Sequence, residues 1–224
     1  MNYYTEEQPW GSTTYDIEKA SYVGFMSKRQ RVEFITNPHF GRMLFLDGVL
    51  QSSSSDEHIY HEALVAPELF SWRPERVLIA GGSEGAVARE VLKHDCVKGC
   101  VMVDWDDELV AHCRWLEGFN SDAFTDARLK YVCQDISEFC NGAFEPFDLA
   151  FLDLLDMETD YDFDFVKSII AVLFEKGTKA VVVNVGRKKS LAELLVYYRG
   201  GVIKEIMVPS FQEPWYLVTI SLYQ

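Results

Sequence analysis

Short apolar runs alternate with stretches of helical periodicity through the second part of the chain. Five runs of strand length lie at residues 77–80, 100–103, 129–133, 148–152 and 180–184. The intervening stretches predict helices near residues 86–93, 108–116, 137 and 163–174. Because parallel strands need crossover helices and are buried on both faces, this alternation predicts βαβ units in a parallel sheet with helices on both faces. Residues 202–208 and 216–222 predict an antiparallel pair at the sheet edge.

The first part of the chain has a different pattern, with β-rich runs at residues 22–26 and 31–35. Asp47-Gly48 stands between two further apolar runs, which is a strong hairpin signal. Asp56 precedes a helical pattern over residues 57–70, and we expect its side chain to cap that helix. We therefore predict a small β-hairpin domain at residues 1–55 and an α/β domain at residues 56–224.

Composition limits the classes of protein and partner. The 224 residues are 48% hydrophobic and 25% charged, with no apolar run of 18 residues, so we expect no membrane span. Residues 1–10 are polar and acidic and do not resemble a signal peptide. The net charge of −14 argues against nucleic acid or an anionic membrane as a partner and favours a cationic ligand.

Five cysteines occur without a CxxC pair, which predicts free thiols in a reducing, cytoplasmic compartment and no metal site.

Polar and glycine-rich segments follow the predicted parallel strands, where ligands bind in open α/β sheets. The first run leads into Gly81-Gly82, in a turn that lacks the GxGxxG pattern of dinucleotide sites. Asp104 ends the second run, 22 residues after Gly82, a position from which a carboxylate can accept hydrogen bonds from ribose hydroxyls. Simple turn chemistry and a helix N-terminal charge are the alternatives for these two features.

Acidic residues end the third and fourth runs. Asp135 can reach an adenine amino group or cap the following helix. The fourth run ends in a series of carboxylates: Asp153, Asp156, Glu158, Asp160, Asp162 and Asp164. Such a series suits a cationic amine, and its alternative is a solvated acidic loop.

Four motifs together resemble the spermidine synthase (polyamine aminopropyltransferase) family. They are FGRMLFLDGVLQ at residues 40–51, DEHIYHE at 56–62, LIAGGSEG at 78–85 followed by Arg89-Glu90, and DLLD at 153–156. The resemblance implies a Rossmann-like, methyltransferase-type parallel sheet with an antiparallel C-terminal edge, preceded by the small β-hairpin domain. It also implies transfer of an aminopropyl group from decarboxylated S-adenosylmethionine to a diamine such as putrescine, giving spermidine and methylthioadenosine.

The resemblance also assigns roles to individual residues. Asp153 would be the catalytic base, Tyr60 would orient the acceptor amine and Asp156 would bind it. Trp10 and Trp215 would lie near the acceptor. The donor would be bound by seven residues: Gln30, Gln51, Gly81, Gly82, Glu84, Asp104 and Asp135. Decarboxylated S-adenosylmethionine would be a co-substrate, with no tightly bound cofactor, and the family implies a homodimer.

Departures from the family pattern keep two alternatives open. Glu84 and Asp104 stand where the family has aspartate and glutamate, and Met157-Glu158-Thr159 replaces a proline-containing loop. The segment between Val185 and Phe211 is short for the family, and we expect one or two helices to be missing there. The alternatives are an S-adenosylmethionine-dependent methyltransferase and a non-catalytic paralogue.

Overall fold

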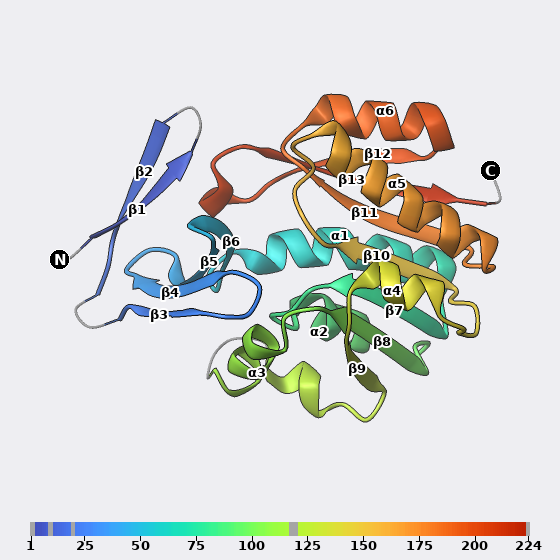
Figure 1. The fold of residues 1–224 in the computed structure, drawn as a ribbon, viewed down its shortest axis with the longest axis horizontal. Helices are drawn as coiled ribbons and strands as arrows, with labels where there is room; N and C mark the ends of the chain where they lie inside the picture. The colour runs from blue at the N-terminus through green and yellow to red at the C-terminus, as the bar shows by residue number, and fades with distance from the viewer. Residues whose placement is uncertain (1–2, 9–10, 19–20, 117–120, 223–224) are drawn as a thin grey trace.

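The computed structural model describes residues 3–8, 11–18, 21–116 and 121–222. These residues form a seven-stranded sheet, a four-stranded sheet and a two-stranded sheet. In Figure 1 the two-stranded sheet lies at the N-terminal end of the molecule, away from the helices that cover the large sheet.

The seven-stranded sheet has the order β12-β13-β11-β10-β7-β8-β9. Its five parallel strands are β7 (Arg76–Gly81), β8 (Gly99–Asp104), β9 (Leu129–Cys133), β10 (Leu149–Asp153) and β11 (Ala180–Gly186). The antiparallel strands are β12 (Val202–Met207) and β13 (Pro214–Ser221). The predicted parallel sheet and antiparallel pair are thus confirmed. Of the antiparallel pair, β12 is the edge strand, because β13 lies between β12 and β11.

Helices cover both faces of this sheet. Helices α1 (Glu57–Trp72) and α2 (Ala86–Leu92) share one apolar core with it. The other core is shared with α4 (Ile136–Asn141), α5 (Asp160–Glu175) and α6 (Lys189–Arg199), which lie toward the viewer in Figure 1. Helix α6 lies in the segment between Val185 and Phe211 and was not among the helices that we predicted.

The strand order reverses at β7, which places a ligand crevice at one end of the sheet. From β7 the chain moves outward through β8 and β9, then crosses back to β10 and β11 on the other side. The connections after β7 and β10 consequently lead to helices on opposite faces of the sheet, α2 and α5, and ligands of open α/β sheets bind in the crevice between such connections.

Six strands precede α1. Strands β1 (Tyr3–Gln8) and β2 (Gly11–Asp16) pair with each other, and β3 (Val23–Met26), β4 (Arg31–Asn37), β5 (Gly41–Leu46) and β6 (Val49–Ser53) form the four-stranded sheet. Asp47 and Gly48 both have positive φ (51° and 87°), as the predicted tight hairpin requires. One face of the four-stranded sheet packs on α3 (Asp107–Trp115), with Phe34 in the shared core. This packing fixes the sheet beside the end of β8.

The expected helix cap at Asp56 is wrong. Its side chain makes no capping hydrogen bond in α1. The carboxylate instead accepts hydrogen bonds from the Ser210 backbone N–H (2.7 Å) and hydroxyl (2.9 Å) in a 3₁₀ turn, Pro209–Phe211. A buried carboxylate needs such donors, and here they link the start of α1 to the chain before β13. The link encloses the crevice on that side.

All five cysteines are free thiols, as predicted, and Cys100, Cys113 and Cys140 are buried. Within the described ranges, no helix is long and apolar enough to cross a membrane.

Candidate active site

A cavity of about 300 Å³ opens beyond the C-terminal ends of the parallel strands. We call it the main cavity. It is lined by residues from the loops after β7, β8, β9 and β10 and from the end of β11. Its other walls come from β5, β6, the start of α1 and the segment around Trp215. All ten residues that the resemblance assigned to donor binding or catalysis line it: Gln30, Gln51, Tyr60, Gly81, Gly82, Glu84, Asp104, Asp135, Asp153 and Asp156.

The turn after β7 brings the backbone into contact with the loop after β10. Gly81 and Gly82 both have positive φ (83° and 74°), which favours glycine. A Cβ atom on Gly81 would lie 1.9 Å from the Asp153 carbonyl oxygen, so no other residue fits without displacing that backbone. The close approach holds the glycine turn and Asp153 together.

Asp104 lies at the end of β8, buried in the cavity floor. Its carboxylate accepts a hydrogen bond from the Asp106 N–H at 2.9 Å. Burial is the main cause that raises the Asp104 pKa, to about 6. Hydrogen-bond donors such as two ribose hydroxyls would stabilise the ionised form of this buried carboxylate.

Gln30 and Asp135 have structural partners as well as positions on the cavity wall. The Gln30 amide donates to the Asp106 carboxylate at 2.9 Å, and Ser27 donates to the same oxygen at 2.7 Å. Asp135 accepts from the Ser137 N–H at 2.7 Å and caps α4. Both roles proposed for Asp135 are thus compatible, since its carboxylate caps a helix and faces the cavity.

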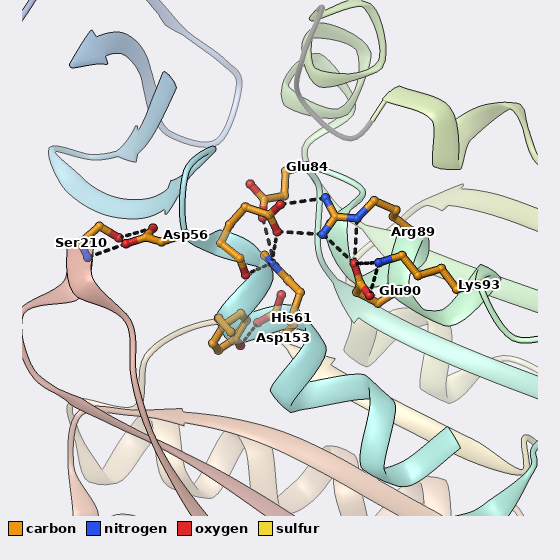
Figure 2. A network of polar contacts seen from close by, with 10 residues as sticks. Asp56, His61, Glu84, Arg89, Glu90, Lys93, Asp153 and Ser210 are labelled. Atoms are coloured by element: carbon orange, nitrogen blue, oxygen red, sulfur yellow. Dashed lines mark hydrogen bonds and ion pairs between the residues drawn. The ribbon is translucent and has the colours of Figure 1, made fainter. Parts of the chain in front are cut away.

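Glu84 belongs to a network of charged residues, which we call the charged network (Figure 2). The buried His61 ring lies between two carboxylates, with Nδ1 2.6 Å from Glu57 and Nε2 3.1 Å from Glu84. Burial alone would lower the His61 pKa, but the two carboxylates prevail and raise it to about 10, so the ring is a cation at neutral pH.

The outer part of the charged network consists of Arg89, Glu90 and Lys93. Arg89 makes two contacts with Glu57, of 2.8 and 3.0 Å, and Lys93 reaches Glu90 at 2.7 Å. Within the described residues, Glu84 Oε2 is buried at the cavity without a hydrogen-bond partner. A cationic group of a ligand would supply the missing donor.

Tyr60 and Asp153 are in direct contact. The Tyr60 hydroxyl donates to Asp153 Oδ1 at 2.5 Å. Burial, followed by the Asp153 charge, raises the Tyr60 pKa well above its usual value, and burial is also the main cause that raises the Asp153 pKa. Burial raises the pKa of Asp156 to about 6, although the charge of Arg187 opposes the change. A carboxylate whose pKa is raised toward neutrality is suited to accept a proton.

Asn184 joins the two carboxylates and was not predicted. Its Oδ1 accepts from the Trp215 indole N–H (2.8 Å) and the Gly186 N–H (3.0 Å). Its side chain also hydrogen-bonds Asp153 and Asp156, which lowers the pKa of each. The sequence signal for Asn184 was its position as the polar residue that ends the fifth apolar run. His61 was also not predicted, although it lies in the DEHIYHE motif.

The rest of the acidic series does not reach the cavity. Asp162 forms a capping box with Thr159 at the start of α5, and Asp164 pairs with Lys167 on the surface. Acidic residues are favoured in the first turn of a helix, which accounts for this half of the series. Gln51 lies at the exposed rim, where its amide donates to the Val49 carbonyl. Trp10 lies outside the described residues.

The Asp156 pKa leads to a pH prediction. An alkylamine stays protonated up to about pH 10, whereas Asp156 gains its charge only as the pH rises through about 6. We expect amine affinity to rise about tenfold from pH 5 to pH 7, because only the ionised carboxylate attracts the ammonium. Calorimetric titration of a diamine at both pH values measures this. An equally steep dependence in Asp156→Asn would contradict the assignment.

Comparison with known sequences decides the family. The sequence model described as the spermine/spermidine synthase domain matches residues 57–218, and one described as the spermidine synthase tetramerisation domain matches residues 2–54. The chain belongs to the spermine/spermidine synthase family. The resemblance drawn from the four motifs is thereby confirmed. The second description names a tetramer, where we had expected a homodimer.

Two similar family members are named polyamine aminopropyltransferases. Polyamine aminopropyltransferase 1 of Hyperthermus butylicus is 40% identical over 196 residues, which are 85% of this chain and 64% of that protein. Polyamine aminopropyltransferase 2 of Caldanaerobacter subterraneus is 34% identical over 231 residues, 95% of this chain and 76% of that protein. The chain thus spans just under two thirds of the length of the first relative.

Solved structures confirm the spermidine synthase fold. The spermidine synthase of Thermotoga maritima superposes with a TM-score of 0.83 at 22% identity, covering 98% of this chain and 79% of that one. A spermidine synthase in complex with the transition-state analogue AdoDATO gives a TM-score of 0.84 at 22% identity, covering 98% and 80%. At 22% identity this similarity establishes only the fold.

Proposed function

We propose that this family member transfers an aminopropyl group from decarboxylated S-adenosylmethionine to a diamine such as putrescine, producing spermidine and methylthioadenosine. The observation that carries the proposal is the Tyr60–Asp153 pair, which lies in one cavity with Glu84 and Asp156. Three carboxylates around one cavity suit two cationic substrates that must meet.

The donor would lie across the strand ends. Asp104 would accept hydrogen bonds from the ribose, Asp135 would face the adenine, and Gly81 and Gly82 would allow the nucleoside to approach the backbone. Glu84 would bind the primary ammonium of the aminopropyl tail through the buried oxygen that has no partner. The carboxylate of ordinary S-adenosylmethionine would meet Glu84 there, and this repulsion would exclude it.

The acceptor would bind with one nitrogen beside Tyr60 and Asp153. Asp156 would attract its ammonium, and Asp153 would take one proton so that a nitrogen lone pair becomes free. That nitrogen then attacks the methylene carbon attached to sulfur. A C–N bond forms, the C–S bond breaks with its electron pair going to sulfur, and neutral methylthioadenosine leaves. Because a sulfonium is a good leaving group, alignment of the two substrates would supply much of the rate.

Parallel calorimetric titrations test the proposal. We expect decarboxylated S-adenosylmethionine and methylthioadenosine to bind more tightly than S-adenosylmethionine, because only the last places a carboxylate against Glu84. Transfer to putrescine is then followed by the appearance of spermidine. A preference for S-adenosylmethionine would favour a methyltransferase, and binding of none of the three would favour a non-catalytic paralogue.

We also propose a cytoplasmic multimer that assembles through residues 2–54. The description of the family model that matches this segment supports the assembly, and five free cysteines support a reducing compartment. Sedimentation of the purified protein would distinguish a dimer from a tetramer.

A further inference from the structure

A second, smaller cavity lies next to the acceptor side of the main cavity. We call it the side cavity. It measures about 50 Å³, and Leu50, Phe211 and Trp215 line both cavities. Its other walls include two carboxylates, Glu6 and Glu213, and the guanidinium of Arg187. It thus provides a small charged space that shares an aromatic wall with the main cavity.

Arg187 is a further residue of the side-cavity wall. Its guanidinium lies over the Trp215 ring, 5.5 Å from the ring centre, and its side chain is only 15% exposed. Two carboxylates flank it, Glu158 at 3.8 Å and Glu213 at 3.9 Å. Its charge also lowers the pKa of Asp156, so its field reaches the acceptor site.

The backbone at the end of β11 sets this position. The pairing of β11 with β13 shifts register between Asn184 and Gly186, and such a bulge redirects the side chains that follow. Gly186 has a φ of 83° and packs against Asp156, where an added Cβ atom would lie 3.1 Å from the Asp156 Cβ. Arg187 therefore begins at a backbone position that is in contact with Asp156.

We propose that Arg187 determines acceptor length, by filling the place where the far ammonium of a triamine would bind. An indole face with carboxylates beside it is a site that a substrate ammonium prefers. Here the chain's own guanidinium holds that site, pairs with Glu158 and Glu213 and repels a further cation. A diamine fits in front of Arg187 and a triamine does not. The inference rests on the proposed transfer to an amine.

Substitution of Arg187 separates its bulk from its charge. Arg187→Ala would uncover the Trp215 face and enlarge the side cavity, which shares Trp215 with the main cavity, whereas Arg187→Met would keep a long side chain and remove only the charge. The matched control is Lys188→Ala, which removes a neighbouring cation that pairs with Glu158 at 2.7 Å. Each variant is assayed for transfer to putrescine and to spermidine. Calorimetry measures the binding of both amines in the presence of methylthioadenosine.

We expect Arg187→Ala to raise the ratio of spermidine to putrescine, in kcat/KM and in affinity, by at least about tenfold, roughly 1.4 kcal/mol. Arg187→Met should give a smaller rise, and Lys188→Ala should keep the wild-type ratio. An unchanged ratio in Arg187→Ala, or an equal rise in Lys188→Ala, would overturn the inference. If the wild type binds amines without transferring to them, the proposed function fails while the affinity ratio still tests Arg187. If no amine binds to any variant, both fail.

Discussion

Asp153→Asn is expected to fold like the wild type and to lose aminopropyl transfer, with kcat lower by about 10²–10⁴-fold, the usual contribution of a positioned base. Asparagine has the same shape and can still accept the Tyr60 hydrogen bond that Asp153 accepts at 2.5 Å. It cannot take the amine proton. Since burial raises the Asp153 pKa, removing the charge should leave the free energy of unfolding unchanged or increase it.

The control for this variant is Asp164→Asn, which changes another aspartate of the same acidic series. Asp164 is exposed and pairs with Lys167, so its loss should leave kcat near the wild-type value. Single-turnover rates with saturating donor and amine make the comparison at the chemical step. Wild-type turnover by Asp153→Asn would exclude this residue as the base.

His61→Leu is expected to destabilise the protein by about 3–5 kcal/mol, the usual cost of breaking a buried ion pair by removing one partner. Leucine would fill most of the space of the ring but would leave Glu84 Oε1 and Glu57 Oε2 without the imidazolium that now lies 3.1 and 2.6 Å away. Denaturant unfolding at neutral pH measures the loss. Donor affinity should fall as well, because Glu84 would no longer be fixed.

The pH dependence gives this prediction a second readout. The His61 pKa is raised to about 10 in the folded protein. Protonated His61 therefore makes its full contribution to the free energy of unfolding below its pKa in the unfolded chain, about 6.5. That contribution is lost as the pH rises through its pKa in the folded protein. The stability difference between wild type and His61→Leu should narrow toward pH 10. The control is Lys93→Ala, at the exposed outer end of the charged network. This change should lower the free energy of unfolding by less than about 1 kcal/mol. A loss from His61→Leu no larger than that would show that the network contributes little.

The sequence predicted the sheet and the cavity wall because both follow from local patterns. Four of the five parallel strands, β7, β8, β10 and β11, contain a run of at least four apolar residues, and the polar residues that follow such runs lie at the edge where ligands bind. This reasoning found Asp104, Asp135 and Asp153. Helix α6 was not predicted, because the segment between Val185 and Phe211 was interpreted only through its short length relative to the family. The helical spacing of Leu191, Ala192 and Leu195 was the available signal.

Long-range partners were beyond the reach of sequence patterns. Asp56 has the residue type and place of a helix cap, yet its donors come from Ser210, 154 residues later. The His61 pKa depends on Glu84, which lies in the turn before α2 and is brought close only when α2 packs beside α1. The position of Arg187 depends on a bulge between two strands. Each of these is set by tertiary packing, which a single sequence does not display.

The contact between Gly81 and Asp153 restricts how this scaffold can acquire new substrates. An added Cβ atom would lie 1.9 Å from a carbonyl oxygen, so the junction of β7 and β10 tolerates almost no variation. Diversification is left to walls that carry no part of the proposed chemistry, namely Leu50 and Phe211, which line both cavities, and Arg187 of the side cavity. A library for a new acceptor would therefore keep the strand ends and Tyr60 constant and randomise these three positions.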